Sequence, residues 1–259
     1  MNNKKILFNC STNIKGGAVQ NAANFIIASA NSISNYEYYY LVSISVHKII
    51  KESNLEIENL FVLSKSPSRS FNARKYIRTL SNKIKPDLVF TMAGPAYVNF
   101  NYLHLMGCSN PYILFAKAKE ILFGRNFINF IGRYLHTKYQ LHFINKADYF
   151  LFQTNSSRDA YINKFNVRLK KTYVVPNAVG FKSEEYRGIA NNSNFERKNK
   201  KIRILCPIEK FHHKGFHIIP KLMKYLEKIS VYVDFIITID NENTHVNTSS
   251  LNSNYKSTV

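Results

Sequence analysis

Residues 6–27 read ILFNCSTNIKGGAVQNAANFII and join a short apolar run, a glycine-containing loop and an amphipathic segment. The apolar run at 6–10 predicts a buried strand, and the apolar residues within 18–32 recur at helical spacing. Between them, Gly16 and Gly17 suit a tight turn. A strand, a tight loop and a helix in this order predict the first unit of a parallel α/β sheet.

The same alternation continues along most of the chain. Further strands are expected at 38–46, 58–63, 87–92, 112–115, 149–153 and 172–175. Helices are expected at 70–84, within 123–145 and at 156–166. Alternating strands and helices predict a complete, doubly wound parallel-sheet domain over residues 1–180.

The character of the sequence changes after this domain. Residues 181–201 are polar and charged and are expected to form a linker. Residues 202–240 contain a strand, a helix and a strand, which predict the start of a second doubly wound domain. Residues 241–259 are rich in Asn, Ser and Thr and are expected to be disordered. The sequence therefore predicts a chain that stops partway through its second domain.

The net charge narrows the classes of partner. It is +20, from 36 Lys+Arg against 16 Asp+Glu. A field of this sign attracts nucleic acid, anionic lipid headgroups or phosphorylated substrates. Because the sequence has no RRM, KH, zinc-finger or helix-turn-helix signature, nucleic acid is not an expected partner.

The cysteines and the apolar runs indicate the cellular compartment of the protein. Cys10, Cys108 and Cys206 show no CxxC spacing, and one thiol stays free in any disulfide scheme, which favours a reducing compartment. The first residues lack the longer apolar region and the cleavage site of a signal peptide. No stretch reaches the ~18 apolar residues of a spanning helix. These features predict a cytoplasmic protein that can contact the inner face of a membrane.

The loop at 13–17, with sequence NIKGG, is a candidate binding site. It joins the first expected strand to the first expected helix, so its amides and the helix N-terminus face the carboxyl edge of the sheet. Anions and sugar hydroxyls bind readily at such a position. The alternative is a turn that needs Gly16 and Gly17 only for their backbone angles.

Several motifs occur in an order that is typical of one enzyme family. They are NIKGGAVQNAANFI at 13–26, KPDLVFTMAGPAYVNF at 85–100, ADYFLFQTNSSRDAY at 147–161, VVPNAV at 174–179 and ILCPIEKFHHKGFHIIPKLMKYL at 204–226. The ordered set resembles glycosyltransferase family four, which belongs to the GT-B class. This resemblance implies two Rossmann-like domains, with the acceptor bound by the first and the nucleotide sugar mainly by the second.

The resemblance also implies an activity. Such enzymes transfer a sugar from a nucleotide-sugar donor with retention of anomeric configuration, usually without a metal or another cofactor. The acceptor is expected to be a cell-surface glycan or a lipid-linked sugar. The family's paired-glutamate motif has no match after residue 239, so activity of this chain alone is in doubt. The alternative is a non-catalytic remnant or acceptor-domain protein that associates with a membrane or with a separate donor domain.

The resemblance assigns roles to two pairs of residues. Pro176 and Asn177 match the family's hinge motif, although Ala178 replaces its glycine. An ordinary loop entry is the alternative, because proline fixes one backbone angle and Asn often bonds its own backbone. Lys214, and approximately Lys210, match cations that neutralise the departing diphosphate at a helix N-terminus. The alternative for both is a solvated lysine on a basic chain.

Histidines provide two further candidates. His104 begins an HLMG stretch that some relatives share, and it is the candidate catalytic residue, able to bond a sugar hydroxyl or orient the reacting centre. A structural histidine within an apolar run is the alternative. His212, His213 and His217 are not expected to bind a metal, because adjacent histidines rarely reach one ion and no carboxylate or cysteine completes the set.

The expected helix within 123–145 is both apolar and basic. Arg125, Arg133 and Lys138 accompany several Phe, Ile, Tyr and Leu residues. Such a segment can lie on an anionic leaflet, where each basic residue near the surface is worth about 1 kcal/mol. It can also pack its apolar face against the sheet. The two readings are compatible if they involve different sides of the helix.

Overall fold

The computed structural model describes residues 3–32, 35–115, 127–168, 171–178, 202–206, 218–231 and 233–237. The chain forms two compact units, Met1–Gly188 and Ile189–Val259. The expected linker at 181–201 and the expected disordered tail at 241–259 lie outside the described residues. Within the part that is described, no helix has the length and apolarity needed to cross a membrane.

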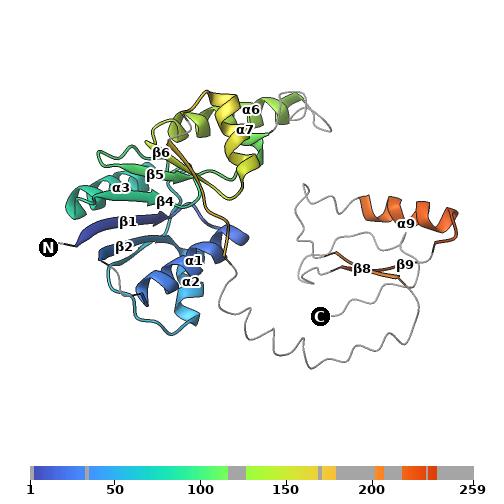
Figure 1. Cartoon of the computed structure of the whole chain (residues 1–259), viewed down its shortest axis with the longest axis horizontal. Coiled ribbons are helices and arrows are strands. Elements are labelled where there is room, and N and C mark those ends of the chain that lie inside the picture. The colour runs from blue at the N-terminus through green and yellow to red at the C-terminus, as the bar shows by residue number, and fades with distance from the viewer. Residues whose placement is uncertain are drawn as a thin grey trace. The chain divides into compact units, whose positions relative to one another are not determined.

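The first unit alternates strands and helices along the chain (Figure 1). Its strands are β1 (Lys4–Cys10), β2 (Tyr36–Ser43), β3 (Leu60–Leu63), β4 (Leu88–Thr91), β5 (His104–Gly107), β6 (Tyr149–Phe152) and β7 (Thr172–Val174). Its helices are α1 (Gly17–Ala30), α2 (Ile44–Glu52), α3 (Phe71–Ile84), α4 (Pro111–Leu114), α6 (Phe127–Ile144) and α7 (Asn155–Phe165).

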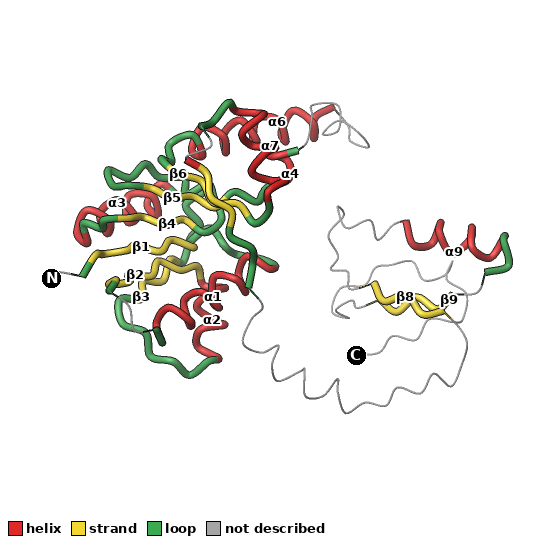
Figure 2. Tube along the Cα trace, in the orientation of Figure 1, coloured by secondary structure: helices red, strands yellow, loops and turns green. Residues whose placement is uncertain are grey.

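The strands form one seven-stranded sheet in the order β3-β2-β1-β4-β5-β6-β7. Every neighbouring pair is parallel, and helices flank the sheet (Figure 2). The chain builds from β1 to β2 and β3, then returns to β4 and continues in the other direction. The strand order therefore reverses between β1 and β4, where ligands bind in open α/β sheets. The predicted doubly wound α/β fold is confirmed.

Core clusters form on both faces of the sheet, because successive side chains of a strand point to opposite sides. Phe8 packs with Ile26 of α1 and Val46 of α2 in one cluster. Its neighbour Leu7 packs with Ile77 of α3 in the other. The continuous apolar run of β1 is thus explained by burial on both faces, which is typical of a parallel sheet.

The prediction of a strand at 112–115 is wrong, because α4 begins at Pro111. Asn110 caps this helix, since its side chain accepts a hydrogen bond from the Tyr112 amide at 3.0 Å. Proline is compatible with the first position of a helix, where its missing N–H is not needed. The strand of this region is instead β5, which pairs with β4 and β6.

The strand expected at 38–46 ends earlier, at Ser43. The Ser43 hydroxyl accepts a hydrogen bond from the Val46 amide at 3.3 Å, which caps the N-terminus of α2. The sequence analysis missed this nine-residue helix. Short apolar runs do not distinguish a buried strand from a helix, so a capping serine inside such a run is easily overlooked.

Two aspartates close the amino edge of the sheet in the same way. Asp87 precedes β4, and its carboxylate accepts a hydrogen bond from the Lys5 amide at 2.7 Å while its own amide donates to the Lys5 carbonyl at 2.9 Å. Asp148 precedes β6 and exchanges the same two bonds with His104, at 2.9 and 3.0 Å. The Lys-Pro-Asp and Ala-Asp motifs therefore have a structural role, because each aspartate fixes the register of a neighbouring strand.

Replacing Asp148 with alanine is expected to lower the free energy of unfolding by about 1 kcal/mol, because the His104 amide loses its acceptor at a partly buried edge. Urea unfolding followed by circular dichroism measures this change. Asp159→Ala is the matched control, since Asp159 is exposed and pairs with the adjacent Arg158 at 2.8 Å, so its loss is expected to have a smaller effect. Equal effects of the two substitutions would contradict this role of Asp148.

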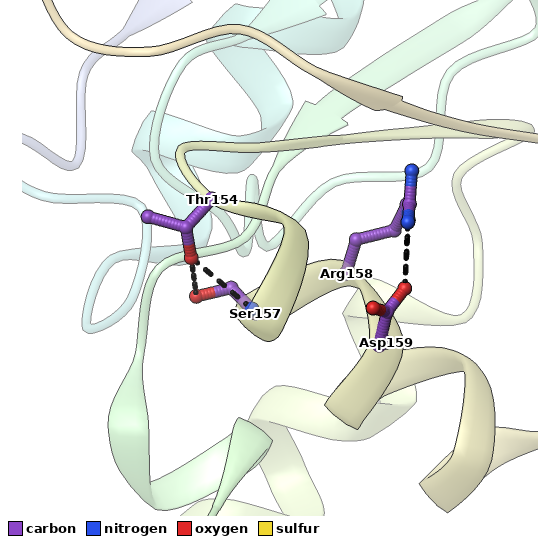
Figure 3. Close-up of polar contacts among 4 residues, drawn as sticks. All are labelled: Thr154, Ser157, Arg158 and Asp159. Carbon is purple, nitrogen blue, oxygen red and sulfur yellow. Dashed lines mark hydrogen bonds and ion pairs between the residues drawn. The ribbon is translucent and has the colours of Figure 1, made fainter.

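The Gln-Thr motif after β6 also has a structural explanation. Thr154 caps α7, because its hydroxyl accepts a hydrogen bond from the Ser157 amide at 3.2 Å and donates to the Ser157 hydroxyl at 3.0 Å. Figure 3 shows this cap beside the Arg158–Asp159 ion pair. A threonine at this position stabilises the first turn of the helix.

The described part of the second unit consists of β8 (Ile202–Cys206), α9 (Ile219–Lys228) and β9 (Val233–Ile237). The two strands are parallel and pair over their full lengths. This strand–helix–strand unit agrees with the elements expected within 202–240. Lys210, Lys214 and the three neighbouring histidines lie in a stretch outside the described residues.

Candidate functional site

The loop between β1 and α1 lies at the carboxyl edge of the sheet, beside the point where the strand order reverses. The Thr12 hydroxyl donates a hydrogen bond to the Ala93 carbonyl at 3.0 Å, which ties this loop to the one after β4. From the other side, the Ser45 hydroxyl donates to the Ile14 carbonyl at 3.0 Å. Hydrogen bonds to the segment after β4 and to the first turn of α2 therefore hold the loop in place.

Asn13 is the central polar residue of this loop. Its side chain is 3% exposed, and its amide nitrogen donates a hydrogen bond to the Ala18 carbonyl at 3.0 Å. The Ser43 hydroxyl donates to the Asn13 carbonyl. The Asn13 Oδ1 atom is buried and has no hydrogen-bond partner among the described residues. A buried acceptor of this kind can receive a hydrogen bond from a ligand.

The N-terminus of α1 is open. Gly16 has φ 65°, in the left-handed region that favours glycine, and both Gly16 and Gly17 are exposed. A Cβ atom at either glycine would meet no atom within 4 Å. No side chain in the described part of the chain caps the helix, and its first turn has no acidic residue. The first amides therefore leave a partial positive charge and donors that a ligand can reach.

The two cysteines of this edge are not nucleophiles. Cys10 ends β1 and is completely buried, which raises the pKa of its thiol far above its ordinary value. Burial also raises the pKa of Cys108, after β5, to about 12. Because the thiolate is the reactive form, both side chains are inert at neutral pH. These two thiols therefore supply no nucleophile at this edge of the sheet.

A chain of buried hydrogen bonds supports the loop from inside the sheet. The Ser11 amide and hydroxyl donate to Asn9 Oδ1 at 3.2 and 2.7 Å. Asn9 Nδ2 donates to the Thr91 hydroxyl at 3.3 Å, and Thr91 Oγ1 lies 2.9 Å from His104 Nε2. The Thr91 hydroxyl has one hydrogen and two lone pairs, so it can accept from Asn9 and still either donate to His104 Nε2 or accept from it, according to the tautomer of the ring.

His104 is 1% exposed and lies at the start of β5, at the end of this chain. Its ring packs edge-on against the Phe100 ring, with 4.9 Å between the two ring centroids. The Nδ1 atom is buried and has no hydrogen-bond partner among the described residues. Burial lowers the pKa of His104 to about 4, and the nearby Asp148 carboxylate opposes this shift. The position favours a neutral, supporting residue, and a direct catalytic role of His104 stays a prediction.

The remaining candidates are not brought to this loop by any described contact. Pro176 and Asn177 are exposed and follow β7, so they lie where the chain leaves the sheet, and their role as a hinge stays a prediction. Lys210 and Lys214 lie outside the described residues. Among the residues that are described, no group of three His, Cys, Asp or Glu side chains is placed to hold a metal ion.

Sequence analysis found Gly16 and Gly17 but missed the polar residues around them. Asn13 was noted only as part of the glycine loop, and Asn9, Ser43 and Thr91 were not considered. Asn9 and Thr91 are polar residues inside otherwise apolar strands, and this pattern could have indicated a buried network. Their partners, however, follow from strand pairing, which the sequence does not reveal.

Comparison with known proteins gives a likeness in fold. No protein-family model matches the chain, and no curated protein matches its sequence. S. aureus MnaA, in a co-structure with UDP, is 8% identical and matches with a TM-score of 0.52 over 93% of this chain and 64% of its own. UDP-N-acetylglucosamine 2-epimerase from Rickettsia bellii is 8% identical and matches with a TM-score of 0.51 over 91% of this chain and 62% of its own.

A glycosyltransferase from Rickettsia africae ESF-5 is 13% identical, with a lower TM-score of 0.47 over 93% of this chain and 69% of its own. The match spans less than two thirds of the length of the S. aureus and R. bellii proteins. At such low identities the matches show the fold alone. The chain has a GT-B-like α/β fold, and family four within that class is not shown.

Proposed function

We propose that this chain binds a nucleotide sugar and belongs to a glycosyltransferase that transfers the sugar to a cell-surface glycan or a lipid-linked acceptor. The observation that carries the proposal is the open N-terminus of α1, with Gly16 and Gly17 exposed beside the unpartnered Asn13 Oδ1. A sugar hydroxyl both donates and accepts hydrogen bonds, and a diphosphate is an anion. The site offers suitable partners for either group.

In this proposal, the loop orients the sugar or diphosphate end of the donor at the carboxyl edge of the sheet. The hydrogen-bond chain from Ser11 to His104 keeps the loop in one geometry, which lowers the entropic cost of aligning the reactants. Lys210 and Lys214 are proposed to neutralise the departing diphosphate. Retention of configuration and a metal-free reaction are part of the proposal through the resemblance to family four. A cytoplasmic location is part of it through the spacing and odd number of the cysteines.

A second candidate function is epimerisation of a nucleotide sugar. It is favoured by the R. bellii neighbour, a UDP-N-acetylglucosamine 2-epimerase whose TM-score is above 0.5. Both candidates require nucleotide-sugar binding, so calorimetric titration of the full chain with UDP-N-acetylglucosamine and with other nucleotide sugars is the first test. Analysis of the products then separates transfer, epimerisation and no reaction. Failure to bind any nucleotide sugar would leave the alternative of an acceptor-domain binding protein.

Gly17→Glu is expected to weaken nucleotide-sugar binding at least about tenfold, because a carboxylate at the helix N-terminus occupies the open space and repels the diphosphate. The same change is expected to raise the free energy of unfolding by about 0.5–1 kcal/mol, since an acidic residue in the first turn favours the helix and glycine does not. Calorimetry and thermal unfolding measure the two opposite effects.

Gly17→Gln separates the effect of charge from that of size. Gly132→Glu is the matched control, because a Cβ at this exposed glycine of α6 also meets no atom within 4 Å. It is expected to leave binding unchanged. Unaltered affinity in the Gly17→Glu variant would place the ligand elsewhere.

A further inference from the structure

An apolar stripe follows the outward side of α6. Ile131, Leu135 and Tyr139 recur at four-residue spacing and therefore share one side of the helix. They are 40%, 60% and 38% exposed. The opposite side of α6 is buried, with Ile144 in the core of the first unit. The helix thus packs inward through one apolar side and still leaves a second one exposed.

The stripe continues onto α3 through Arg74. The Arg74 guanidinium carbon lies 5.7 Å from the centroid of the Tyr139 ring and 5.1 Å from that of the Phe71 ring, and the guanidinium donates a hydrogen bond to the Tyr139 hydroxyl. Phe71 is 82% exposed. Phe71, Ile131, Leu135 and Tyr139 are called the α3–α6 surface below. It joins two helices that are far apart in the sequence.

Basic side chains border this surface. His136 follows Leu135 on α6, and its pKa is lowered by partial burial and by the positive charges of Arg133 and Arg69. Both arginines therefore lie close to His136. Lys138 also belongs to this helix and lies 5.5 Å from the centroid of the Tyr134 ring. Lys138 thus lies beside the stripe. Arg133 lies on the other side of α6, where its guanidinium carbon is 4.9 Å from the centroid of the Tyr112 ring.

The two described segments that carry these cations have no acidic residue. Residues 59–86, which include α3, and residues 127–147, which include α6, contain Lys and Arg but no Asp or Glu. These two segments therefore carry a net positive charge, and an anionic partner is the complementary one.

We propose that the α3–α6 surface binds the surface of an anionic phospholipid bilayer. Phe71 and Leu135 enter the boundary between headgroups and acyl chains, while the exposed side chains of Arg69 and Lys138 contact lipid phosphates. A bilayer fits better than nucleic acid, because exposed aliphatic side chains gain free energy from acyl chains and not from a phosphodiester backbone. The surface is independent of the proposed nucleotide-sugar site.

Sedimentation of the full chain with lipid vesicles tests the proposal. The protein is expected to sediment with vesicles that contain phosphatidylglycerol and to stay in solution with pure phosphatidylcholine vesicles. Added salt should release it, because screening weakens the attraction of basic residues to the anionic surface. Equal binding to both kinds of vesicle, or none to either, would overturn the proposal.

Two sets of substitutions separate the apolar and the ionic contributions. Phe71→Ser with Leu135→Ser is expected to reduce the partition coefficient at least about tenfold, because two inserted side chains are lost. Arg69→Gln with Lys138→Gln is expected to reduce it about fivefold per charge. These four side chains are exposed, so the variants should fold, which circular dichroism checks.

Ile44→Ser is the matched control, because Ile44 is 45% exposed but belongs to neither α3 nor α6. It begins α2, which packs against the core cluster that contains Phe8. It is expected to sediment like the unaltered chain. Nucleotide-sugar affinity should be unchanged in all these variants, so the two proposals can fail separately. If single-stranded DNA binds the surface and vesicles do not, the partner is nucleic acid and the bilayer proposal is wrong.

Discussion

Replacing Gly107 with alanine is expected to lower the free energy of unfolding by about 4 kcal/mol or more. A Cβ at this last residue of β5 would lie 1.8 Å from the Met92 carbonyl oxygen and 2.8 Å from its carbon. Both are backbone atoms of the segment just after β4, so they cannot move aside as a flexible side chain does. Since a domain is typically stable by about 5–15 kcal/mol, such a loss removes much of its stability.

Urea unfolding followed by circular dichroism measures the effect of Gly107→Ala. Gly132→Ala is the control, because a Cβ on that glycine of α6 meets no atom within 4 Å. Alanine favours a helix over glycine by up to about 1 kcal/mol, so the control is expected to stabilise the protein. If both variants have the same urea midpoint as the unaltered chain, the Met92 carbonyl does not lie as close to Gly107 as the structure places it.

Lowering the pH from 6.5 to 4 is expected to destabilise the first unit by about 3 kcal/mol through His104 alone. Burial holds the pKa of His104 near 4 in the folded chain, against an ordinary value of 6.5. Between these values the unfolded chain binds a proton that the folded chain does not. The contribution is therefore fully present above pH 6.5 and is lost as the pH falls towards 4.

The free energy of unfolding, measured by urea denaturation at several pH values, checks this expectation. His104→Gln removes the titrating group and should flatten the dependence between pH 4 and 6.5. His136→Gln should flatten it less, since the pKa of His136 is lowered in the same direction but its side chain is exposed. An unchanged slope in the His104 variant would show that this ring is not buried in its neutral form.

These two predictions rest on the close packing of Gly107 and the burial of His104, which the sequence analysis did not find. Gly107 was only part of the HLMG stretch, and His104 was a candidate for contact with the substrate. The structure places His104 on β5, under Phe100 and beside Thr91, because β5 replaces the strand that was expected at 112–115. A four-residue strand with a polar first residue has too little apolar pattern to be recognised.

The candidate site was predicted in part. The glycine loop at 13–17 was placed correctly between a strand and a helix, because glycine and a change of apolar spacing are local signals. The unpartnered Asn13 Oδ1 was not predicted. Its environment depends on Ser43 of β2, which is 30 residues away in the sequence. Lys210 and Lys214 stay predictions.

The sequence by itself determined the alternation of strands and helices, and hence the doubly wound parallel sheet. That information is local, because the spacing of apolar residues reports which face of each element is buried. Only the tertiary structure decided which residues meet: Asn9 with Thr91, Thr91 with His104, and Phe71 with Tyr139 through Arg74. These contacts depend on the order and register of strands and on helix packing, which arise from the whole chain and leave no local pattern in the sequence.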